Sequence, residues 1–242
     1  MIMYSSFIKS EIKKWSRDSM MGFMALYPFI FGFIGRYFLP WVADKSDLNI
    51  DLYADLIIVI LTLVVPISFG ALIAFSILED RDDNILTSVK ATPLSITQFL
   101  SFRFILVLVL TYITTLFVIW FSNIGDIPIK NILAIAFLAS LEAPMYGMLI
   151  NSLSNNKIEG FAVMKGLGSF ILFPIIALFF FDKKELFFSF APGFWAAKAI
   201  SSIIKGEGVL YLSYYQYYFI GLVYLVLLNI ASYKLFIRKV EI

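Results

Sequence analysis

Residues 56–78 read LIIVILTLVVPISFGALIAFSIL, an apolar run without a charged side chain. A helix needs about 20 apolar residues to cross the hydrocarbon core of a bilayer, and this run is long enough. Further charge-free runs occupy 104–125, 166–181 and 208–233, a shorter one lies at 19–35, and 131–156 is interrupted only by Glu142. Backbone polar groups inside lipid must bond within their own segment, so each run is predicted to be helical.

These runs predict an all-α membrane protein with one transmembrane domain over residues 1–242. We expect spans at about 20–40, 56–78, 100–121, 129–151, 161–181 and 211–234. Hydrophobic residues make up 61% of the chain and charged residues only 15%, which excludes a soluble domain with its usual quarter of charged residues. No polar segment between the spans is long enough to form a second domain.

The chain has no cysteine and no histidine. This excludes a thiolate nucleophile, a disulfide framework and an intramembrane metalloprotease of the His-Glu-x-x-His type. We therefore expect no metal site, no cofactor bound by this chain and no enzymatic activity of its own. The net charge of +2 indicates no particular partner, and we expect no nucleic acid.

Residues 4–18 are predicted to form an amphipathic helix on the membrane surface. Apolar residues recur there at helical spacing, at Tyr4, Ile8, Ile12 and Trp15, and basic residues lie outside that stripe, at Lys9, Lys13, Lys14 and Arg17. The alternative is a frayed basic tail. The apolar run behind it is too long, and lacks the cleavage site, for a signal peptide, so we expect it to remain as the first span.

The distribution of basic residues predicts the orientation. With six spans, both termini share one side, and that side holds most of the 19 lysine and arginine residues. The positive-inside rule therefore places both termini in the cytoplasm of a protein of the cell membrane.

Residues 79–95, EDRDDNILTSVKATPLS, follow the second span. Acidic residues suit a helix N-terminus, Ile85, Leu86 and Val89 form an apolar face, and Pro93 should end the helix. A short cytoplasmic helix over 79–92 with such a face is typical of a segment that docks on a partner.

This segment resembles that of permease subunits of ABC-2 type ABC exporters. Asp80, Arg81 and Asp82 match the charged group of the family, and Thr92-Pro93-Leu94-Ser95 matches its exit into the third span. Asn84 stands where glycine is usual, and Ile85-Leu86 matches the family's Thr-Leu loosely. The segments 151–168 and 191–200 resemble the family's inner loop and its outer segment, so the likeness covers the whole chain.

The resemblance implies one half of an exporter. Family members dimerise into a twelve-helix pathway and bind two ATPase subunits, which carry ATP and Mg. This chain has no Gly-x-x-x-x-Gly-Lys-Ser/Thr phosphate loop, so the ATPase would be a separate chain. The predicted ATPase-coupling residues are Glu79, Asp80, Arg81, Asp82, Asp83, Ile85, Leu86 and Val89.

Glu142 lies inside the fourth span, beside Pro144. An ionisable residue there is costly and often lines a pathway, so Glu142 is a candidate pathway or gating residue. The alternative is a protonated acid that bonds a carbonyl freed by the proline. Arg36 and Lys165, near the ends of their spans, are expected to extend toward the lipid headgroups, and the alternative for each is a contact with substrate.

Residues 182–208 carry more aromatic side chains than an aqueous loop would. We predict two short helices that dip back into the outer leaflet and cap the pathway, with Pro192, Phe194 and Trp195 as candidate site residues. The alternative is an interfacial aromatic belt.

The predicted function is export of an amphipathic or hydrophobic substrate, such as a drug, a lipid or a membrane-active peptide, driven by a separate ATPase. The scarcity of charge within the spans favours such cargo. The alternative is a secondary transporter or channel without ATP coupling, which would need paired intramembrane charges or internal repeats. The second permease half is either this chain again or a relative.

Overall fold

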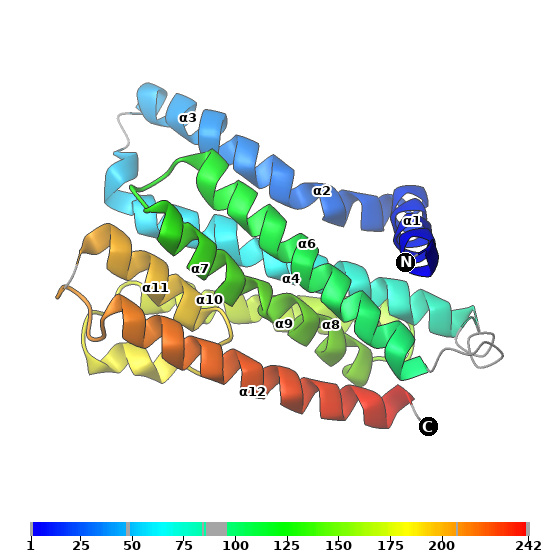
Figure 1. Cartoon of the computed structure of the whole chain (residues 1–242). Helices are drawn as coiled ribbons and strands as arrows, with labels where there is room; N and C mark the ends of the chain where they lie inside the picture. The colour runs from blue at the N-terminus through cyan, green and yellow to red at the C-terminus, as the bar shows by residue number, and fades with distance from the viewer. Residues whose placement is uncertain (1, 47–48, 84, 86–95, 207, 241–242) are drawn as a thin grey trace.

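We describe the protein from a computed structural model that covers residues 2–46, 49–83, 85, 96–206 and 208–240. In these residues, six helical segments are long and apolar enough to cross a membrane, which confirms the predicted all-helical fold with six spans. They lie side by side along one direction, and the two chain ends lie at the same end of the bundle (Figure 1). The segments are Ser19–Ser46, Ile50–Asp82, Ile96–Ser122, Ile129–Leu153, Lys157–Ala177 and Tyr214–Lys239.

Helix α1 (Ile2–Arg17) precedes the first span and runs crosswise to it at one end of the bundle (Figure 1). Its protein-facing side holds Trp15 and Glu11, both buried, whereas Ile12 is 54% exposed. The helix predicted over 4–18 is therefore present. Within the predicted apolar stripe, however, Trp15 packs against the protein and Ile12 is exposed. Asp18 ends α1 and caps α2 (Ser19–Phe33), accepting hydrogen bonds from the backbone of Met20 and Met21.

The first span is longer than predicted, because Pro40 does not end it. After α2 a π-helical turn, Ile34–Phe38, leads into α3 (Leu39–Ser46), and Leu39 donates its backbone hydrogen bond to Ile34. Pro40 thus falls in the first turn of a new segment, where its missing N–H costs little. The span therefore runs past Trp41 as far as Ser46.

Helix α4 (Ala54–Asp82), preceded by a short 3₁₀ turn (Ile50–Tyr53), is the central helix of the bundle. It is apolar on every side, as a helix surrounded by others must be. It packs against α2, α6 (Ile96–Ser122), α8 (Glu142–Leu153) and α9 (Lys157–Gly168). Gly70 permits the close contact with α8: a Cβ atom there would lie 2.7 Å from the carbonyl oxygen of Ala143.

The fourth span consists of two helices, α7 (Ile129–Ser140) and α8 (Glu142–Leu153), joined at Leu141. Pro144 lacks the backbone N–H that would continue the hydrogen bonds of the helix, so a helix break near this position is expected. Asn229 of α12 (Tyr214–Val240) donates a 2.8 Å hydrogen bond to the carbonyl of Leu141. The last helix thereby bonds the backbone at the break.

The fifth span joins α9 (Lys157–Gly168), a 3₁₀ turn (Ser169–Ile171) and α10 (Leu172–Ala177). The chain then forms two short helices, a 3₁₀ helix at Lys183–Phe188 and α11 (Phe194–Lys205), as the sequence predicts for 182–208. Helix α11 packs against α4, α10 and α12 at the end of the bundle opposite the termini (Figure 1). The depth of this segment in a bilayer stays a prediction.

Candidate functional site

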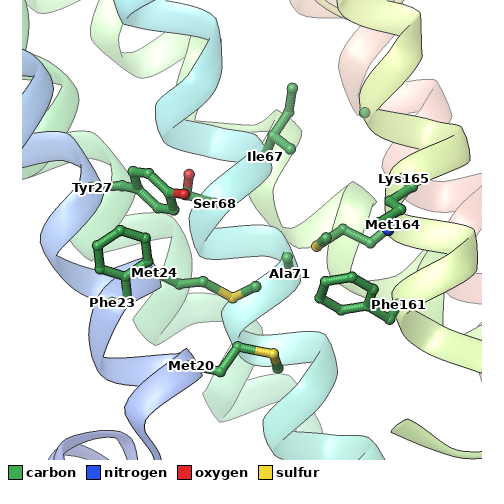
Figure 2. Close-up of a pocket in the computed structure, with 11 residues that line it drawn as sticks. Met20, Phe23, Met24, Tyr27, Ile67, Ser68, Ala71, Phe161, Met164 and Lys165 are labelled. Atoms are coloured by element: carbon green, nitrogen blue, oxygen red, sulfur yellow. The ribbon is translucent and has the colours of Figure 1, made fainter. Parts of the chain in front are cut away.

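A cleft of about 360 Å³ opens between α2, α4 and α9 (Figure 2). Its floor is the surface of α4, where the small residues Ser68 and Ala71 are both buried. Because α2 and α9 both pack on α4, their larger side chains form two walls above this floor. The cleft therefore exists because small residues on the central helix lie between bulky residues on its neighbours.

The walls of the cleft are apolar, aromatic and rich in methionine. Figure 2 shows side chains of α2 and α9 pointing toward one another across α4. The α2 wall includes Phe23 and Tyr27, whose ring centroids lie 4.5 Å apart, and the α9 wall includes Phe161. Three methionines complete the lining, at Met20, Met24 and Met164. Such side chains adapt to the shape of an aromatic ligand.

Lys165 is the one charged residue among those that line the cleft. Its Nζ lies 4.8 Å from the centroid of the Phe161 ring, one helical turn earlier on α9. Arg36, which the sequence analysis grouped with it, is exposed on the π-helical turn of the first span.

A second groove, of about 500 Å³, lies between α6, α8 and α12. It is more open than the first, and it also contains a lysine, Lys234, together with Phe104, Pro144 and Asn229. Each groove therefore contains one lysine. The first groove has more methionines and is lined by the Phe23–Tyr27 ring pair.

Glu142 is buried at the break between α7 and α8. In the part of the chain that the structure describes, its Oε1 atom has no hydrogen-bond partner. The carbonyl that Pro144 frees is that of Ser140, four residues earlier. The hydrogen bond of Asn229 goes to the next carbonyl, that of Leu141. The alternative in which Glu142 is tied to a carbonyl freed by the proline therefore receives no support, and its role in a pathway stays a prediction.

The end of the bundle where the two chain ends lie holds a buried ion network centred on Arg103 of α6. Its guanidinium pairs with Glu11 of α1 and, at 2.5 Å, with Asp80 of α4, and all three side chains are about 3% exposed. Lys14 of α1 adds a 2.6 Å bond to Asp80 and a 2.8 Å bond to the carbonyl of Ser76. The network ties α1, α4 and α6 together.

A second link joins α2 to α9 at the same end. Lys157 Nζ lies 2.5 Å from Asp18 Oδ2, and this bond is the main cause that lowers the pKa of the Asp18 carboxyl. Arg81 extends to the carbonyls of Asn151 and Ser154, at 3.4 and 3.5 Å.

The predicted coupling residues fall into different surroundings. Glu79, Asp80, Arg81 and Asp82 form the last turn of α4, so the prediction that they begin a separate helix is wrong. Helix α4 continues through Pro66 and the whole apolar run to Asp82. Asp80 is buried, Asp82 and Asp83 are exposed, and Ile85 is 40% exposed. Leu86, Val89 and most of the predicted 79–92 helix lie outside the described residues.

A third cluster of buried charges lies at the opposite end of the bundle. Lys198 of α11 and Glu185 are both fully buried, with Nζ and Oε2 2.7 Å apart, and Tyr217 donates a hydrogen bond to Glu185. Burial is the main cause that lowers the pKa of Lys198, and Glu185 opposes it. Nearby, Asp55 of α4 accepts hydrogen bonds from Ser201 and pairs with Lys205 at 3.1 Å. Phe194 and Trp195 are buried beside this cluster, and Pro192 is half-buried.

Sequence reasoning missed these ion networks, although single residues signalled them. Glu11 is the one acid in a basic helix, Arg103 stands alone in an apolar run, and Lys198 lies among alanines. Each would be costly without a partner, so each predicts one. The partners could not be read from the chain, because they lie far away in sequence. The described residues contain no cluster of ligands able to hold a metal ion.

Six membrane-length helices with an apolar cleft between them define a multi-pass membrane protein. The chain belongs to the Rv2686c-like family of fluoroquinolones export permease proteins, whose family model matches residues 11–233. Membership of this family confirms the resemblance to ABC-2 type export permeases.

Two relatives come from Mycobacterium tuberculosis, the fluoroquinolones export permease proteins MT2760 (strain CDC 1551 / Oshkosh) and Rv2686c (strain ATCC 25618 / H37Rv). Each is 28% identical to this chain over 205 residues, which cover 81% of this chain and 80% of the relative. No solved structure matches the chain significantly.

Proposed function

We propose that this protein is the transmembrane half of an ATP-driven exporter of aromatic drugs of the fluoroquinolone type. The α2–α4–α9 cleft is the observation that carries the proposal. Its volume of about 360 Å³ falls within the range of small-molecule sites, and its lining suits a flat aromatic ring system. The names of the two mycobacterial relatives supply the drug class.

A separate ATPase, in two copies with ATP and Mg, would dock at the inner end of α4 and on the segment that follows it. The Arg103 network supports this assignment, because it joins the end of α4 to both α1 and α6. A push on that end would move three helices as one unit. Helix α4 also forms the floor of the cleft, so the same movement would reshape the drug site.

The second permease half would pack against α9. This helix is among the least buried spans, and apolar residues stay exposed on its continuation through α10, at Phe170, Leu172 and Ile176. Gly166 and Gly168 have nothing within 4 Å of their Cβ positions, which leaves room for a close helix contact. A second copy there would close the open side of the cleft and form a pathway between the protomers.

The test is drug accumulation in living cells. Cells that express this chain with its ATPase should accumulate less ciprofloxacin than cells that lack the chain. Replacing the catalytic glutamate of the ATPase should abolish the difference. Equal accumulation in cells with and without the chain would contradict the proposal, and export that survives the ATPase variant would favour a secondary transporter.

A further inference from the structure

We infer that Lys165 is the counter-charge for a carboxylate on the exported drug, so that the cleft selects aromatic acids. This inference rests on the proposed function and adds a specificity-determining residue to it. Three observations about Lys165 carry it: its depth in the span, its lack of an acidic partner, and its position beside an aromatic ring in the cleft.

The first observation is depth. Lys165 lies eight residues after Lys157, the first residue of α9, or about 12 Å along the helix at 1.5 Å per residue. The inner end of α9 is marked by the bond between Lys157 and Asp18. A lysine at this depth is costly in hydrocarbon, and such residues usually serve a partner or a passing substrate.

The second observation is the missing partner. Lys14, Lys157 and Lys198 each pair with a carboxylate at 2.7 Å or less. Among the described residues, no carboxylate lies within 4.0 Å of the Lys165 ammonium group. The ammonium group lies instead over the ring of Phe161. The chain therefore pairs these three lysines internally, whereas Lys165 faces the cleft.

The third observation is the arrangement around the charge. Phe161 lies beside Lys165 on one wall, and Phe23 and Tyr27 lie on the other (Figure 2). Fluoroquinolones carry a carboxylate directly on a fused aromatic ring. A drug stacked between these walls could place its carboxylate at the ammonium group, and the charge-assisted bond would distinguish the acid from a neutral analogue.

The test measures equilibrium binding to the complete permease–ATPase complex in phosphatidylcholine nanodiscs, with ciprofloxacin and its methyl ester as probes. Lys165→Met removes the charge, Lys165→Arg keeps it, and Lys234→Met is the matched control in the second groove. Lys165→Met should weaken binding of the acid about tenfold, because a hydrogen-bonded ion pair is lost, and should leave the ester unchanged. Lys165→Arg and Lys234→Met should bind both probes as the wild type does.

Several results would overturn the inference. If Lys165→Met bound the acid as tightly as the wild type does, Lys165 would not be the counter-charge of the drug carboxylate. Equal losses of affinity for acid and ester would mean that only the shape of the cleft had changed. A loss in Lys234→Met instead would place the drug in the other groove. An effect seen only after phosphatidylglycerol is added would assign Lys165 to lipid headgroups. A wild-type complex that binds neither probe would defeat the proposed function itself, which separates the two failures.

Discussion

Lys198 and Glu185 show how single residues stabilise the end of the bundle opposite the termini. Both side chains are fully buried, so each depends on the other to offset the loss of water. Removing one partner leaves an uncompensated charge, whereas removing both leaves none. We therefore expect either single substitution to destabilise the protein strongly, and the double substitution to destabilise it much less than the sum of the two single ones.

We expect Lys198→Met to lower the stability of the complex by about 3–5 kcal/mol, because Glu185 is left buried and alone. The double variant with Glu185→Gln should recover most of that loss, as coupled neighbours do. Thermal unfolding of the purified complex measures both. The control is Lys184→Met, whose pair with Asp182 is exposed and should contribute less than about 1 kcal/mol. A double variant as unstable as the single one would contradict the pairing.

Glu142→Gln tests the buried carboxyl at the break between α7 and α8. Because Oε1 of Glu142 has no partner among the described residues, an amide should fit there without loss of stability. If the charge takes part in gating, drug export should fall while membrane insertion and the melting temperature stay at wild-type values. Glu142→Asp should retain part of the export. Unchanged export by Glu142→Gln would exclude a role for the charge.

At the scale of elements, the apolar runs predicted the helices well, because bilayer thickness sets their length. Prediction was weakest at helix ends. The first span was expected to end at about residue 40, but a π-helical turn before Pro40 makes the missing N–H of this proline harmless, and the helix continues. Glu79–Asp82 were expected to begin a separate helix. They end α4 instead, where Lys14 pairs with Glu79 and Arg103 pairs with Asp80, and these partners are distant in sequence.

The exposed end of α4 carries a prediction about the ATPase. Asp82 and Asp83 are exposed, whereas Asp80 lies in the Arg103 network and would perturb the fold if reversed. We expect the double variant Asp82→Lys, Asp83→Lys to lose association with the ATPase in a pull-down. Asp51→Lys, at the other end of the same span, is the matched control and should associate normally. Undiminished association of the double variant would exclude this end as the docking site.

At the scale of the whole molecule, composition and the six spans indicated a multi-pass membrane protein, and the resemblance of residues 79–95 to a known family indicated an export permease. The cleft could not be predicted, because it arises from α2, α4 and α9 meeting across long sequence separations. The sequence shows that Lys165 is a charged residue within a span. Its position beside Phe161 and opposite Tyr27 could be recognised only from the three-dimensional structure.

The open face of α9 predicts how two copies assemble. Gly166→Trp adds a large side chain where this chain has nothing within 4 Å, so a single copy should fold normally. If a second permease half packs there, the variant should yield a stable single copy where the wild type yields a pair. Size-exclusion chromatography with light scattering in detergent distinguishes the two. A pair that persists in Gly166→Trp would place the interface elsewhere.

The most direct measurement is ATP-dependent uptake of ciprofloxacin into proteoliposomes that contain the purified permease and its ATPase, with the ATPase facing outward. The account predicts that drug accumulates against its gradient with ATP and Mg, and that omitting this chain or inactivating the ATPase abolishes uptake. Equal uptake without ATP, or no uptake by a complex that hydrolyses ATP and binds the drug, would contradict an ATP-driven exporter.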